Sequence, residues 1–166
     1  MSVWSKFRKA SVAALVFGVV SVAGTNQQAL AAGCYGSTCD NKGPVSMGCT
    51  SDTVKVLGTP AGGVALAYSK ACNAYWAYST SAPNWYDATV YIERSYYDAG
   101  TKLYKNVKRL QITFSPGEES EWTNMLGSYG PANEAFRGLV DWNDPSYPGI
   151  EATRWHCHKK GCPPWL

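Results

Sequence analysis

The chain has 166 residues, of which 45% are hydrophobic, 13% aromatic and only 16% charged. This length suits one domain, and the composition excludes a disordered chain, since such chains are rich in charge and poor in aromatic residues. Of the 15 Lys and Arg residues, Lys6, Arg8 and Lys9 precede any acidic residue, and the remainder balances the 12 Asp and Glu residues. The neutral remainder lacks the basic surface of a nucleic-acid-binding protein.

The first 32 residues have the pattern of a secretory signal peptide. Basic residues precede an apolar run from Ala10 to Gly24, and a polar stretch leads into Ala29-Leu30-Ala31-Ala32. The run is shorter than the roughly 20 residues of a membrane-spanning helix. We therefore expect cleavage after Ala31 or Ala32 and a secreted, extracellular domain over 33–166 that has no membrane partner. Lipid modification of Cys34 is the alternative, although Leu30 lies one place too early for that processing motif.

Six cysteines remain after cleavage, an even number that favours disulfides in an oxidising compartment. They are Cys34, Cys39, Cys49, Cys72, Cys157 and Cys162. Fifteen pairings are open. The first two and the last two each enclose four residues, which suits two short bridges and leaves Cys49 for Cys72. The rival interpretation of the C-terminal tail, 156–166, is a metal site formed by His156, Cys157, His158 and Cys162. We expect disulfides, no metal and no cofactor.

The segments between the cysteines predict short strands and turns. Residues 33–51 are rich in Gly, Ser and Pro and have no apolar periodicity, so they predict a cystine-rich loop. Apolar and polar residues then alternate with period two in several runs, the sign of half-buried strands. The expected strands are 53–57, 64–68, 74–79, 88–97, 110–114, 135–140 and 150–155.

Two details refine this pattern. Glu118 to Glu121 could form a helical turn, but the glycines that follow exclude a long helix. Val64, Leu66 and Tyr68 share one face of their strand, and the small residues Ala65 and Ala67 on the other face suggest that something packs there as well. About seven or eight short strands predict an all-β fold, either a sandwich or a small barrel.

The motifs GCYGSTC, Gly48-Cys49, ALAYSKACNAYW and ATRWH resemble those of the secreted YjfA-like domain-of-unknown-function family of actinobacteria and bacilli. The resemblance covers essentially all of 33–166 and implies a small secreted β-rich domain without an established activity. That family commonly has arginines where this chain has Ala67 and Tyr78, and it usually ends near Trp155. The Cys157 and Cys162 tail therefore looks like an addition.

No catalytic motif stands out. The patterns G-x-S-x-G and H-E-x-x-H are both absent, and only His156 and His158 could serve as the base of a triad. Carboxylates that could act in glycoside hydrolysis are Glu118, Glu119, Glu121, Asp141 and Asp144. Most of these lie in turn-like sequence, and Asp141-x-Asn143 only begins like a calcium loop.

The aromatic residues are the stronger clue to function. Many must supply core area, because Leu, Ile, Val and Phe are few. Adjacent aromatics such as Tyr96-Tyr97 point to opposite faces of a strand, so one of each pair can face solvent. We therefore expect a secreted, non-catalytic binding module for a protein or cell-envelope glycan, with binding residues Trp85, Tyr86, Tyr97 and Trp142. The alternative is a small extracellular hydrolase that uses Glu119 or Asp141.

Overall fold

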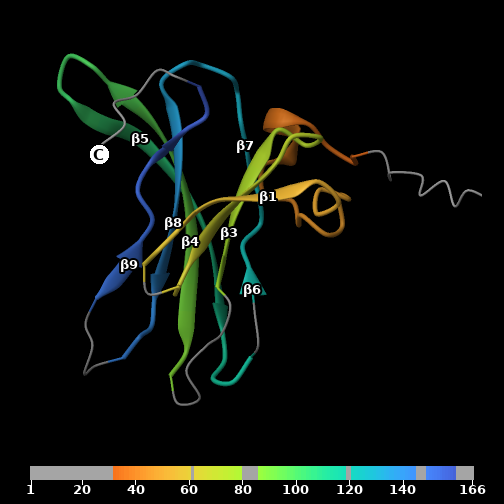
Figure 1. Cartoon of the computed structure of the whole chain (residues 1–166), viewed down its shortest axis with the longest axis vertical. Helices are drawn as coiled ribbons and strands as arrows, with labels where there is room; N and C mark the ends of the chain where they lie inside the picture. Colours follow the sequence, from red (N-terminus) through yellow and green to blue (C-terminus); the bar gives the residue numbers. More distant parts are fainter. Residues whose placement is uncertain (1–31, 61, 80–85, 119–120, 145–148, 160–166) are drawn as a thin grey trace, which may run out of the picture.

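The computed structural model describes residues 32–60, 62–79, 86–118, 121–144 and 149–159. They form two antiparallel sheets that face each other, preceded by a disulfide-bonded loop (Figure 1). The predicted all-β fold is confirmed, and the arrangement is a sandwich rather than a barrel. Within this part of the chain no helix is long and apolar enough to cross a membrane.

The first sheet, here called sheet A, has the order β1-β2-β3-β6, and β7 also pairs with β3. Its strands are β1 (Thr53–Gly58), β2 (Ala65–Ser69), β3 (Ala74–Ser79), β6 (Glu121–Trp122) and β7 (Leu126–Gly127). The first two strands were predicted from their alternation, and the third was predicted as a short strand rich in aromatic residues. Instead of the helical turn predicted over 118–121, Glu121 begins β6, while residues 119 and 120 lie outside the described residues.

The second sheet, sheet B, has the order β10-β8-β4-β5, and β9 also pairs with β8. Its strands are β4 (Ala88–Asp98), β5 (Leu103–Phe114), β8 (Glu134–Asp141), β9 (Ile150–Ala152) and β10 (His156–Cys157). The 12 residues of β5 make it much longer than the predicted 110–114, because its exposed first half pairs with β4 without a regular apolar alternation. In contrast, only the first half of the predicted strand 150–155 is a strand, β9, and β10 begins after the predicted range.

The main core lies between the two sheets. Sheet A contributes Val64, Leu66 and Tyr75, and sheet B contributes residues such as Ile92 and Phe136. Tyr75 stacks on Phe136 with ring centroids 4.0 Å apart, so an aromatic pair joins the two layers. Aromatic rings thus supply core area, as the composition predicted.

The outer face of β2 and β3 in sheet A is also buried, because the N-terminal loop covers it. Ala67, Ala74, Trp76 and Met125 pack there against four cysteines, Cys34, Cys39, Cys49 and Cys72. This confirms that something packs on the small-residue face of β2. The loop contains a short 3-10 helix, η1 (Gly36–Cys39), which the sequence did not predict. In Figure 1 the orange loop lies beside β3 and β7.

Disulfides join Cys34 to Cys39 and Cys49 to Cys72, as the spacing suggested. Cys157 is also disulfide-bonded, which removes the free thiolate that the rival metal site requires. Cys162, its predicted partner, lies outside the described residues. The Cys49–Cys72 bridge fixes the loop onto the turn between β2 and β3, and the Cys34–Cys39 bridge closes a short segment within the loop.

Candidate ligand-binding site

A hollow of about 530 Å³ lies where the N-terminal loop meets the segment after β7. It is lined by Tyr35, Gly36, Ser37, Asn73, Ser128, Tyr129 and Gly130. Three segments that are distant in sequence therefore build it: the start of η1, the turn between β2 and β3, and the loop 128–130. It combines two tyrosine rings with short polar side chains and backbone.

Backbone hydrogen bonds hold these segments together. The Gly36 N–H donates to the Cys72 carbonyl at 2.8 Å, and the Ser128 N–H donates to the Asn73 carbonyl at 2.8 Å. Gly36 has φ +53°, a left-handed conformation that glycine adopts without strain. Gly127 contacts it so closely that a Cβ on Gly127 would overlap the Gly36 carbonyl. The close approach of two glycines is thus what brings the walls of the hollow together.

Tyr129 is exposed yet held in place. The residue is 49% exposed, and the guanidinium of Arg94 lies over its ring at 3.9 Å from the ring centroid. Its hydroxyl donates to Asp40 Oδ2 at 2.7 Å. A ring fixed at both its face and its hydroxyl loses little conformational entropy on binding, which favours a role as a contact platform.

The charges beneath Tyr129 form a network around Asp40, the residue after η1. Arg94 donates to Asp40 at 3.0 Å and to the Gly127 carbonyl at 2.7 Å, and its side chain is only 5% exposed. Lys108 and the Gly127 N–H also donate to Asp40. Burial alone would raise the pKa of Asp40, but the bonds from Lys108, Tyr129 and Gly127 and the charge of Arg94 lower it below the usual value.

A second buried carboxylate holds the loop itself. Glu134, which is fully buried at the start of β8, accepts hydrogen bonds from Ser128 Oγ at 2.5 Å and from the Tyr129 N–H at 3.1 Å. The Gly130 N–H is 3.3 Å from the same carboxylate. Consecutive backbone donors thus share one anion, and this restrains the 128–130 loop.

Tyr35 forms the opposite wall and is 64% exposed. Between the two tyrosines lies the Asn73 side chain, whose amide nitrogen is 3.4 Å from the Ser128 carbonyl and whose oxygen accepts from the Tyr68 hydroxyl at 3.2 Å. Two exposed rings with an oriented amide between them can offer apolar faces and hydrogen bonds to the same ligand.

The predicted binding residues lie elsewhere. Trp85 lies outside the described residues, Tyr86 is half-buried, and Trp142 is half-buried against the main core. Tyr97 lines a second hollow, of about 430 Å³, together with Tyr96, Asp98, Ala99, Lys105, Asn106 and Asn133. Sequence reasoning missed Tyr35 and Tyr129. Their common signal is a tyrosine directly before a glycine in a loop, where a ring is easily exposed.

Both histidine side chains pack against an aromatic residue, Tyr75. His158 Nδ1 lies 3.0 Å from the Tyr75 hydroxyl, and the rings of His156 and His158 both contact the Tyr75 ring. Burial lowers the pKa of both histidines. This position, within the aromatic cluster, gives them a structural role at the β10 edge.

The candidate catalytic carboxylates act mainly in turns. Glu118 accepts the Ser115 N–H at 2.7 Å, and Asp141 accepts the Asn143 N–H at 3.1 Å. Asn143 has φ +49° and bonds to Thr89, so Asp141-x-Asn143 forms an Asx turn. Glu121 and Asp144 are half-buried, and Glu119 lies outside the described residues.

Comparison with known proteins gives no match, since no family model, curated protein or solved structure is significantly similar to the chain. The resemblance to the YjfA-like family stays a prediction from the motifs. The site has therefore to be interpreted from its own geometry.

Proposed function

We propose that the chain is an exported binding module that recognises a cell-envelope glycan or protein through the hollow between Tyr35 and Tyr129. The single observation that carries this proposal is the fixed, half-exposed ring of Tyr129, with Arg94 at 3.9 Å on one face and Asp40 at 2.7 Å from its hydroxyl. A buried ion-pair network that orients a surface ring supports recognition, because the ligand then meets a preformed surface.

Export is part of the proposal and has separate support. The first 32 residues have the pattern of a signal peptide, and the described cysteines are all disulfide-bonded, which suits an oxidising compartment. The neutral charge of the remaining chain favours a ligand recognised by shape and stacking over a nucleic acid. The aromatic rings and the amide of Asn73 suit either a sugar face or a polypeptide segment.

Binding can be measured by co-sedimentation with purified cell walls and by a panel of soluble wall oligosaccharides and surface proteins. Tyr35→Ala removes the more exposed ring and should weaken retention by about tenfold or more, as expected for an aromatic anchor. Tyr129→Phe keeps the ring but loses the bond to Asp40, so it should weaken binding less than Tyr129→Ala.

Trp122→Ala is the matched control, because Trp122 is 41% exposed and pairs with Tyr78 at the other end of β3. Its retention should equal that of the unmodified chain. An equal loss in Trp122→Ala, or no retention on any envelope fraction, would contradict the proposal. Release of reducing sugar ends that disappears in Asp141→Asn or Glu119→Gln would support the hydrolase instead.

A further inference from the structure

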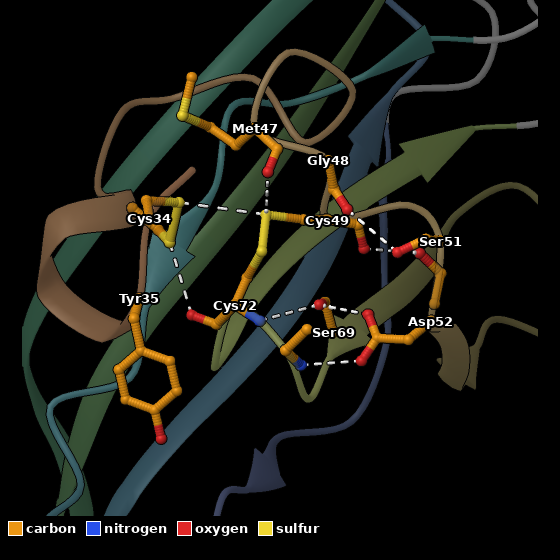
Figure 2. The surroundings of a disulfide bond; sticks show 12 residues. Cys34, Tyr35, Met47, Gly48, Cys49, Ser51, Asp52, Ser69 and Cys72 are labelled. Carbon is orange, nitrogen blue, oxygen red and sulfur yellow. Dashed lines mark hydrogen bonds between the residues drawn. A yellow bond between two sulfur atoms is a disulfide. The ribbon is translucent and has the colours of Figure 1, made fainter. Parts of the chain in front are cut away.

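The two described disulfides lie against each other beneath the N-terminal loop. The sulfur atoms of Cys34, Cys39, Cys49 and Cys72 all lie within 4.8 Å of one another, and Cys34 Sγ is 4.0 Å from Cys49 Sγ. In Figure 2 a dashed line joins the yellow sulfur of Cys34 to that of Cys49. All four residues are buried, so their sulfur atoms form one cluster in the interior.

The arrangement matches the dimensions of a tetrahedral thiolate site. With a Zn–S distance of about 2.3 Å, the sulfurs of such a site are about 3.8 Å apart. The 4.0 Å contact between the two bridges already has this length. When the bridges are reduced, the two sulfurs of each pair separate to a non-bonded contact of similar length, so small side-chain rotations complete the tetrahedron.

The backbone around the cysteines is held by contacts that do not depend on sulfur. The Gly36 N–H bonds to the Cys72 carbonyl, and the Asn41 N–H bonds to the Met125 carbonyl at 2.9 Å. The Cys72 N–H donates to Ser69 Oγ at 3.1 Å, and Figure 2 shows this bond beside the Asp52 carboxylate. Because these hydrogen bonds do not involve sulfur, we expect them to keep the four cysteines close together after reduction.

We propose that the reduced chain binds one Zn²⁺ through Cys34, Cys39, Cys49 and Cys72. A phosphine or dithiol supplies the four electrons, four protons are taken up, and the two disulfides become four thiols. Zn²⁺ then binds four thiolates, and the four protons return to solvent. The same loop is thus anchored at the β2–β3 turn of sheet A by the Cys49–Cys72 disulfide under oxidising conditions and by one metal ion under reducing conditions.

This site differs from the metal site weighed for the C-terminal tail. Four residues separate Cys34 and Cys39, a spacing found among zinc ligands, whereas Cys49 and Cys72 are 23 residues apart and are brought together only by the fold. The buried, closed position corresponds to a structural zinc site, because such a site has no open coordination position.

The test uses the chain with Cys157→Ser and Cys162→Ser, in which the four proposed ligands are the only cysteines. After anaerobic reduction with a phosphine, Co²⁺ is added as a spectroscopic probe and then displaced with Zn²⁺. We expect one Co²⁺ per chain with the intense visible bands of tetrahedral thiolate coordination, and release of four protons per Zn²⁺. Further substitution of Cys34→Ser and Cys39→Ser should weaken binding by about a hundredfold or more.

Resistance to proteolysis separates a folded site from an unfolded thiol-rich chain. Zn²⁺ should restore to the reduced protein the protease resistance of the oxidised one. The proposal is overturned by octahedral Co²⁺ spectra, by binding that survives Cys34→Ser and Cys39→Ser, or by equal binding in strong denaturant. Absence of stoichiometric binding to the reduced chain also overturns it.

Discussion

At the scale of single residues, the most consequential side chain is Arg94. It follows Val90 and Ile92 on the same face of β4, which is otherwise apolar, and its partner Asp40 is 54 residues away in the chain. A buried guanidinium is tolerated only when its charge and its N–H groups are satisfied. Here Asp40, the Gly127 carbonyl and the Tyr129 ring satisfy it, and in doing so they orient the candidate site.

Asp40→Asn should lower the free energy of unfolding at pH 7 by about 2 kcal/mol, because the buried Arg94 loses the charged acceptor of its hydrogen bonds and keeps only the more distant Glu134 carboxylate, 3.9 Å away. The substitution should also change how the free energy of unfolding depends on pH under acidic conditions. The pKa of Asp40 lies below 3.8 in the folded chain, so the unfolded chain binds the extra proton, and stability falls as the pH drops below about 4. In the Asp40→Asn variant, the free energy of unfolding should therefore fall less steeply as the pH drops below about 4.

Urea unfolding between pH 7 and pH 2.5 measures both effects. Asp87→Asn, which removes an exposed carboxylate just before β4, is the matched control and should leave both the neutral stability and the pH dependence under acidic conditions nearly unchanged. If the two variants give the same curves, the Asp40 network does not stabilise the fold.

At the scale of elements, contact between η1 and β7 decides whether the hollow exists. A Cβ on Gly127 would overlap the Gly36 carbonyl, and a Cβ on Gly36 would lie 2.9 Å from the Ser128 carbonyl oxygen, so neither accepts a side chain without movement of backbone. This contact lies directly under Tyr35 and Tyr129. The main role of the short strand β7 is therefore to provide the surface on which the N-terminal loop packs.

Gly127→Ala should destabilise the protein by about 3 kcal/mol, because the new methyl group meets backbone rather than a flexible side chain. It should also weaken ligand retention by displacing η1. Thermal melts and the co-sedimentation assay measure the two effects. Gly100→Ala is the control, since its Cβ meets only the Asp98 side chain, at 3.3 Å, and unchanged melting of both variants would disprove the close contact.

The Cys49–Cys72 bridge should contribute more stability than the other bridges. It joins residues 23 apart, against 5 for Cys34–Cys39, and a longer closed loop restricts the unfolded chain more. Paired Cys49→Ser and Cys72→Ser substitutions should cost about 3 kcal/mol, and the paired Cys157→Ser and Cys162→Ser control should cost less. Melts of both variants in the same oxidising buffer give the order. An equal or larger loss in the control contradicts the prediction.

At the scale of the whole molecule, three layers are stacked: sheet B, sheet A and the disulfide-bonded loop. Strands β2 and β3 of sheet A are consequently buried on both faces, with Leu66 on one side and Ala67 on the other. Strands buried on both faces lack the polar outer face of an ordinary sandwich. The loop is therefore an integral layer of the fold, and its oxidation state bears on the stability of the whole domain.

The exported protein should begin at Ala32 or Gly33 and contain three disulfides with no free thiol. Intact mass before and after alkylation without reduction tests both statements, because each disulfide lowers the mass by two hydrogens and an alkylated thiol raises it. A diacylglycerol group on Cys34 would show lipoprotein processing instead. Thiols that are alkylated without reduction would contradict complete oxidation.

The sequence by itself determined the features that depend on local pattern. Period-two alternation predicted β2 and β4 closely, because side chains on opposite faces of a strand meet different environments, and the strand candidates 74–79 and 135–140 correspond to β3 and β8. The number and spacing of cysteines predicted the two described bridges. Short strands such as β6 and β10 escaped prediction, since two residues carry no periodicity.

Only the tertiary structure decided where the candidate site lies. Tyr35, Asn73 and Tyr129 come from three segments, and Asp40 reaches Arg94 only after the loop folds over sheet A. Alternation along a strand reports whether a residue is buried, but it carries no information about which distant residue covers it. The exposed tyrosines, the buried ion pair and the converging sulfurs all depend on those long-range contacts.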